Sequence, residues 1–273
     1  MKTIITLCLA LALAAPLAWA QEAGEEPKSA DATDLAKKLA NPISSLISIP
    51  IELDYDHNIG PTDEGYRYSL TAKPVVPITL NDDWNLISRT IVPLVGQDEI
   101  FPGAGDQFGV GDILQNFFFS PAQPTARGLI WGAGPVFLLP LASDDLLGGD
   151  RWGIGPTAVL LKQSGPVTYG LLANHLWDVG GDDDRAEINN TFVQPFVSYT
   201  TPSAWTYSLQ TESSYSWESE EWSVPVNIGV SKLAKLGKLP VQYKAGVRYW
   251  ADAPDSGPDD WGFKLGIVFL LPR

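Results

Sequence analysis

Nine charged side chains are candidates for chemistry because each occupies a polar position in a stretch where apolar and polar residues alternate. The basic ones are Arg67, Lys73, Arg89, Lys244, Arg248 and Lys264, and the acidic ones are Glu52, Asp54 and Glu212. If the alternating stretches are β-strands, these side chains point to one side of the sheet. Rings of charge set the selectivity of an aqueous passage and narrow it. The same charges can instead pair with one another and fill a narrow interior.

Catalysis has weaker support than charge selectivity. His57 and His175 are the only histidines in the chain, and His57 lies in an acidic loop. Neither has a serine at a recognisable spacing, although catalytic triads assemble in space rather than in sequence. We therefore expect no catalytic residues and no enzyme, and keep a lipid-cleaving enzyme that uses His175 as an alternative.

Metal and cofactor binding are not expected either. The acidic clusters at 182–184 and 259–260 offer oxygen ligands for divalent cations, but solvated loops explain them better. The glycine-rich runs at 103–106 and 109–112 lack the lysine and the following helix of a phosphate-binding loop. We interpret these glycines as turns and close strand approaches.

The chain after residue 46 alternates with a period of two, which is typical of strands. Clear alternation occurs at 47–56, 66–73, 205–212, 222–231, 239–249 and 261–271, and weaker runs of similar length at 84–95, 108–120, 129–140, 152–162, 167–179 and 191–201. Several runs reach about ten residues, the length that a tilted strand needs to cross a bilayer. Strands of soluble sandwiches are usually nearer five or six residues. The pattern predicts about twelve strands, an even number as bacterial barrels require.

The connections between these runs alternate between long acidic and short neutral or basic segments. Most of the 32 acidic residues lie in the long connections, at 56–65, 96–107, 141–151, 178–189, 216–221 and 251–260. The short turns include 163–166, 201–204 and 234–238, and only the turn at 81–83 is clearly acidic. This alternation is expected of a barrel with two chemically different ends.

Tyrosine and tryptophan gather near the predicted strand ends. The residues are Tyr55, Tyr66, Trp84, Trp131, Trp152, Trp177, Tyr199, Trp205, Trp217, Trp222, Tyr249 and Trp261. Both residue types favour the membrane–water interface because they combine an apolar ring with a polar tip. Their placement supports a barrel that spans a bilayer.

Composition argues against two classes of protein, nucleic-acid binders and helical membrane proteins. A formal net charge of −14 argues strongly against nucleic acid as a partner, because such binding requires basic patches. No stretch of about 18 apolar residues follows residue 20, so no transmembrane helix is expected there.

The N-terminus predicts export. Residues 1–20 have a positive Lys2, an apolar run from Ile4 to Leu13 and a small-x-small site at 18–20, as in a signal peptide. Residues 21–45 are expected to form a periplasmic N-terminal segment with a short helix at 31–40 that Pro42 stops. This segment either plugs the barrel, lies in the periplasm or remains a disordered tail. Cleavage after residue 20 removes Cys8, the single cysteine, and leaves no disulfide.

The predicted fold class is all-β: a transmembrane antiparallel up-and-down β-barrel of about 12 strands with a short N-terminal extension. The barrel covers residues 46–273, and the expected location is the outer membrane of a Gram-negative bacterium. Expected partners are outer-membrane lipid and lipopolysaccharide, a small-molecule solute and, during biogenesis, the barrel-assembly machinery. The chain ends in Pro272-Arg273 rather than in the C-terminal aromatic that this machinery reads in many barrels.

Several runs resemble a family of proteobacterial outer-membrane proteins, the "MetA-pathway of phenol degradation" family. Its members are often labelled transporter and sometimes mislabelled neuromedin U. The runs are WNLISRTIVPL (84–94), FPGAGDQFGVGDILQNFFFSP (101–121), GPVFLLP (134–140), RWGIGPTAVLLKQSGP (151–166), QPFVSYTT (194–201), WSVPVNIGVSKL (222–233) and GVRYWAD (246–252). The resemblance implies an outer-membrane barrel that takes up small hydrophobic or aromatic compounds, and it assigns no functional residues.

The leading functional hypothesis is therefore an outer-membrane channel for the passive uptake of small hydrophobic or aromatic molecules. The first alternative is a closed structural or adhesive barrel whose acidic loops face partners outside the cell. A lipid-cleaving enzyme and a soluble periplasmic β-sandwich are the other two. No ATP-binding motif occurs in the sequence, so active pumping by this chain alone is not expected.

Overall fold

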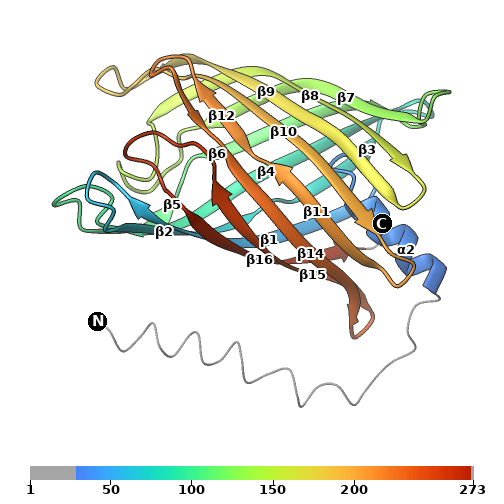
Figure 1. Ribbon diagram of the computed structural model, residues 1–273. Coiled ribbons are helices and arrows are strands. Elements are labelled where there is room, and N and C mark those ends of the chain that lie inside the picture. The colour runs from blue at the N-terminus through green and yellow to red at the C-terminus, as the bar shows by residue number, and fades with distance from the viewer. Residues whose placement is uncertain (1–28, 272–273) are drawn as a thin grey trace.

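Hydrogen bonds join the alternating stretches into one closed antiparallel sheet in the computed structural model, which describes residues 29–271 (Figure 1). Within the described residues the helix α2 (Ser29–Leu39) precedes the sheet. The strands are β1 (Ile47–Ile59), β2 (Gly65–Ala72), β3 (Val75–Thr79), β4 (Trp84–Asp98), β5 (Asp106–Val110), β6 (Ile113–Pro121), β7 (Leu129–Leu139), β8 (Arg151–Ser164), β9 (Val167–Gly181), β10 (Asn189–Thr200), β11 (Trp205–Thr211), β12 (Ser213–Ser216), β13 (Glu221–Ser223), β14 (Pro225–Leu236), β15 (Leu239–Trp250) and β16 (Trp261–Leu271). The predicted all-β barrel is confirmed.

The sixteen segments form twelve barrel strands because four strands are interrupted. β2 and β3 both pair with β1 and β4, and β5 and β6 both pair with β4. β11 and β12 both pair with β10 and form one interrupted strand. β14 pairs with β11 and β13 pairs with β12, so β13 and β14 form the next interrupted strand. Pro74 stands at the first interruption, where a proline removes a ladder donor. The predicted count of twelve is therefore right.

The first and last strands close the barrel. β1 pairs with β16 from Ile47 opposite Leu271 to Tyr55 opposite Phe263. Closure leaves no unpaired sheet edge, which is the condition for a sheet to span hydrocarbon. It also excludes the soluble β-sandwich.

Alternation sends one side-chain set outward and the other into the lumen. On β8, Leu160 is 50% exposed on the outside, whereas the neighbouring Leu161 is 1% exposed inside the barrel. Leucine, valine and aromatic side chains dominate the exposed face. An apolar outer surface of this kind is covered by lipid in a membrane barrel.

Aromatic side chains form a band at each end of the outer surface. We call the end with the long acidic connections the loop end, and the other the turn end. At the turn end, Trp84 and Trp131 meet edge to face with ring centroids 5.9 Å apart. At the loop end, Tyr249 and Trp261 lie 5.0 Å apart. Two such bands mark the two interfaces of a bilayer.

Side chains of the barrel wall anchor the acidic loops. Asp112 accepts hydrogen bonds from the backbone N–H groups of Ala142 (3.2 Å) and Gly149 (2.7 Å), which fixes the connection between β7 and β8. Arg151 forms an ion pair with Asp178 and donates to the carbonyl of Asp182 at 2.5 Å. These contacts satisfy buried polar groups and hold the loops against the barrel.

The N-terminal helix packs against the turn end, beside the connection of β10 to β11 (Figure 1) and against Leu233 of β14 and Leu270 of β16. It ends at Leu39, and the Asn41 side chain accepts a hydrogen bond from the backbone N–H of Ile43 at 3.0 Å just before the barrel begins. Within residues 29–271, no helix has the length and hydropathy needed to cross a membrane. The predicted signal peptide, 1–20, lies outside the described residues, as do residues 272–273.

Candidate functional site

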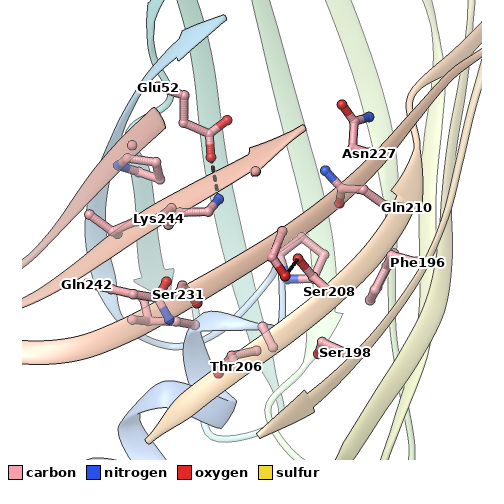
Figure 2. A pocket seen from close by; sticks show the side chains of 18 of the residues that line it. Glu52, Phe196, Ser198, Thr206, Ser208, Gln210, Asn227, Ser231, Gln242 and Lys244 are labelled. Carbon is pink, nitrogen blue, oxygen red and sulfur yellow. Dashed lines mark hydrogen bonds and ion pairs between the residues drawn. The ribbon is translucent and has the colours of Figure 1, made fainter. Parts of the chain in front are cut away.

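One wall of the lumen carries an ion-pair network built on β1. Glu52 pairs with Lys73 at 2.6 Å and with Lys244, the second contact being visible in Figure 2. Asp54 pairs with Lys264 at 2.8 Å. Gly266 lies opposite both Glu52 and Lys244 in the sheet, so the missing side chain leaves room for Lys244 to reach Glu52 across the strand between them.

Arg248 joins the remaining carboxylates of this wall. Its guanidinium lies 2.9 Å from Asp56, 3.4 Å from Glu212 and 3.5 Å from Asp54, and it donates to Asn227 at 3.0 Å. Lys264 also contacts Glu212, at 3.1 Å. Four carboxylates and four cations share these pairs, so the network contributes no net charge to the lumen.

The structure thus brings together seven of the nine predicted lumen residues and separates the other two from the network. Arg67 donates to the side chain of Gln97 at 2.8 Å. Arg89 lies on β4, and no ion pair or side-chain hydrogen bond involves its guanidinium among the contacts of residues 29–271. Asp56 was not among the nine candidates because it stands where the predicted strand at 47–56 meets the predicted connection at 56–65, although it continues the spacing of Glu52 and Asp54. β1 in fact extends to Ile59.

The opposite wall of the lumen carries a buried apolar cluster, together with buried polar side chains such as Asn116 and Asn174. Phe118, Val159, Leu161 and Leu172 form a buried cluster with residues of the strands around them, and Phe192 and Phe196 pack against it. A second cluster contains Val136 and Leu176. Sequence reasoning did not single out these residues because their strands carry apolar side chains on both faces.

Two adjoining cavities occupy the lumen between these walls. The cavity nearer the turn end has about 230 Å³ and is lined by polar side chains of β10, β11, β14 and β15 and by the N-terminal segment (Figure 2). The cavity nearer the loop end has about 390 Å³. Lys73, Arg89, Gln194 and Glu212 line both, so these four residues mark the junction. The side chains therefore do not fill the barrel.

The N-terminal segment, residues 29–46, lines the smaller cavity on the side of the turn end. Ala36 is fully buried against Ala204, Leu233 and Leu270 at the turn end. Gln163 donates to the carbonyl of Lys37 at 2.8 Å. Farther along, Ile43 enters the lumen and joins the apolar cluster.

Gly132 provides the space that Ile43 occupies. A Cβ atom at Gly132 would lie 3.3 Å from Ile43 Cδ1 and 3.2 Å from Phe118 Cβ. The N-terminal segment therefore packs against a part of the barrel wall that has space for the Ile43 side chain.

His175 does not face the lumen. Its Nδ1 lies 2.8 Å from the Thr191 hydroxyl, and its ring packs 4.3 Å from the Trp177 ring on the outward side of β9. Trp217 donates to the same hydroxyl. Among residues 29–271 no serine side chain is hydrogen-bonded to His175, and the aromatic band accounts for its surroundings. Among residues 29–271, no group of three or more histidine, cysteine, aspartate or glutamate side chains is arranged to hold a metal ion.

The barrel is similar to solved outer-membrane proteins of different functions. The COG4313 outer membrane channel from Pseudomonas putida F1 matches with a TM-score of 0.65 and 15% identity, over 83% of this chain and 96% of that chain. Outer membrane phospholipase A from Escherichia coli matches with a TM-score of 0.51 and 12% identity, over 89% and 98%. The KdgM porin matches with a TM-score of 0.46 and 11% identity, over 83% and 100%.

The first two likenesses establish a β-barrel fold of the outer-membrane type, and a fold alone does not assign a function. No family model matches the sequence, and a comparison with curated proteins finds no match. The resemblance to the phenol-degradation family therefore stays a prediction.

Proposed function

We propose that this protein is an outer-membrane channel for the passive uptake of small hydrophobic or aromatic molecules. The observation that carries the proposal is the unfilled lumen, with its two adjoining cavities of about 230 and 390 Å³. Barrels of eight strands are filled by their own side chains or hold one small ligand, and diameter grows with strand number, so twelve strands leave room for a small solute.

The chemistry of the lumen suits a solute with an apolar body. Phe192, Leu172 and Leu176 offer apolar contact along one side of the larger cavity. On the other side every charge that the described residues contribute, except that of Arg89, is paired, and the paired charges attract few counterions and impose a small field on a neutral solute. Apolar lining with a few polar groups is typical of small-molecule sites.

We further propose that residues 29–46 plug the channel from the periplasm. An exported chain with an N-terminal signal peptide places its N-terminus in the periplasm, together with the short turns of the barrel. The packing of Ala36 and Ile43 against the turn end supports this role. Undocking of the segment would open the smaller cavity to the periplasm.

The test is single-channel conductance in a planar bilayer. The wild-type protein without residues 1–20 is compared with a truncated chain that begins at Ile47, the first residue of β1. We expect discrete steps from both, larger or more frequent in the truncated chain, and block by small aromatic compounds. Heat-modifiable migration in detergent gels confirms that each barrel is folded.

A closed structural or adhesive barrel is the second candidate. It is favoured by the anchored loops: Arg185 reaches from one acidic connection to the carbonyls of Asp145 and Gly148 in another. Folded protein that conducts neither with nor without residues 29–46, and that fails to pass aromatic solutes into liposomes, would replace the channel by this candidate.

We propose a non-enzymatic role for the barrel. The His175 contacts to Thr191 and Trp177 support a structural histidine in the aromatic band. The measurement is hydrolysis of phospholipid and fatty-acyl ester substrates by the refolded protein. Hydrolysis that disappears in His175→Ala, with the fold retained, would establish the enzyme alternative instead.

A further inference from the structure

We propose that the larger lumen cavity binds an organic monocarboxylate, with the carboxylate on Arg89 and the apolar body against the wall of β6, β9 and β10. This inference rests on the proposed function and names the class of solute that the channel selects.

Arg67 and Arg89 lie outside the ion pairs of the lumen, and Arg89 is the one whose guanidinium also has no side-chain hydrogen bond among residues 29–271. It projects from the middle of β4 into the junction of the two cavities, beside Lys73 and Glu212. Lys73 is committed to Glu52 at 2.6 Å, and Glu212 to Lys264 and Arg248. Among residues 29–271 no carboxylate lies within ion-pair distance of Arg89, while Glu52 and Glu212 attract it only from farther away.

A partly buried guanidinium without a close partner retains its capacity to bind an anion. Its planar fork matches a carboxylate in a bidentate geometry, and such charge-assisted hydrogen bonds are stronger than neutral ones. Removing a cation from bulk water is costly unless an anion compensates it. A ligand carboxylate would provide that compensation.

Asn116 gives an independent sign of a missing partner in the same place. It lies directly opposite Arg89 on the neighbouring strand and lines the larger cavity. Its side chain is 1% exposed, and its Oδ1 atom has no hydrogen-bond partner. Buried amides are normally satisfied. Because the oxygen and nitrogen of the amide exchange by a half-turn, Asn116 can donate to a carboxylate held by Arg89.

The remaining lining determines the shape of the ligand. Ile91, Leu114, Leu172, Leu176 and Phe192 line the cavity with apolar side chains. Its volume of about 390 Å³ falls in the range of small-ligand sites. A ligand with one negative charge and an apolar ring or short chain fits this lining. The second negative charge of a dianion would be repelled by the carboxylate of Glu212.

The experiment measures binding in detergent, without transport. The signal-free protein is titrated calorimetrically with 4-phenylbutyrate and with its neutral counterpart 4-phenylbutan-1-ol, after subtraction of empty micelles. We expect the carboxylate to bind roughly tenfold or more tightly than the alcohol, the difference that a charge-assisted hydrogen bond makes. Arg89→Gln is expected to remove this difference and leave alcohol binding unchanged.

Arg67→Gln is the matched control because it removes the same charge from another lumen arginine, which Gln97 holds outside the cavity. It is expected to preserve the preference for the carboxylate. Phe192→Ala is expected to weaken both ligands to the same extent.

Equal binding of the two ligands by wild-type protein, or an unchanged preference in folded Arg89→Gln, would overturn the proposal. An equal loss in Arg67→Gln would also overturn it, because the effect would then be general lumen charge. If Arg89→Gln does not fold, Arg89→Lys tests the same point, with a reduced preference expected and a full preference refuting the bidentate site. Binding by a protein that neither conducts nor passes aromatic solutes into liposomes would refute the channel and leave the site standing.

Discussion

Ile43→Ala tests whether the N-terminal segment is held in the lumen by apolar contact. Ile43 is 4% exposed and packs with Phe118 and Val159 of the barrel wall. The substitution removes about three methylene-sized groups, and each is worth about 0.8 kcal/mol when buried. With the cavity left behind, measured Ile→Ala changes in cores cost about 2–5 kcal/mol.

The barrel itself keeps its strands in this variant, so the loss falls on the docking of residues 29–46. A loss of about 2 kcal/mol raises the undocked population roughly 30-fold. If the docked segment blocks the passage, the fraction of time spent in the larger conducting state should rise by the same order until it saturates.

Single-channel recording measures that fraction directly. Ile228→Ala is the control, because it removes the same atoms from a side chain that is 55% exposed on the outer surface. We expect the control to conduct like wild type. If Ile43→Ala and wild type show the same open fraction and step size, the segment does not gate conduction through Ile43, and the plug proposal is refuted.

Two further substitutions test the lumen network and the strand packing. Arg248→Gln leaves three carboxylates without their shared cation, so the unfolding free energy in detergent should fall by about 3–5 kcal/mol. Arg127→Gln, at an exposed turn residue, should change it by less than about 0.5 kcal/mol, and similar values for both would contradict the network. Gly155→Ala puts a Cβ atom 1.7 Å from the His175 carbonyl oxygen and should lower the thermal midpoint measured by circular dichroism, whereas Gly149→Ala, whose Cβ atom would meet only Asp112 at 3.8 Å, should not. Equal midpoints would mean that β8 and β9 shift apart at little cost.

The sequence alone determined the barrel and its two ends. A strand has a side-chain period of two, so the clear alternation from Ile47 to Asp56 fixed which residues share a face. It also placed Glu52 and Asp54 together with the lysines and arginines of other strands. The even number of long runs and the acidic connections predicted closure, because an open edge has no place in hydrocarbon.

The apolar lumen wall illustrates what the alternation conceals. The weaker runs, such as 167–179, are the strands whose inner face is also apolar, as at Leu172 and Leu176 of β9. Two apolar faces cancel the period-two contrast. The alternation in these strands is therefore weak in the sequence. In the structure their inner face forms the apolar side of the candidate site.

Only the tertiary structure decided which charges pair, because pairing depends on the register between strands far apart in the chain. Glu52 and Lys244 meet because β1 and β15 flank β16 at Gly266. Arg89 has the same residue type and the same inward direction as Arg248, yet no carboxylate lies close to it. Composition and periodicity predict the face of the sheet on which a side chain lies. The partner of that side chain depends on barrel closure, which brings Glu52 and Lys244 into contact although they are nearly 200 positions apart.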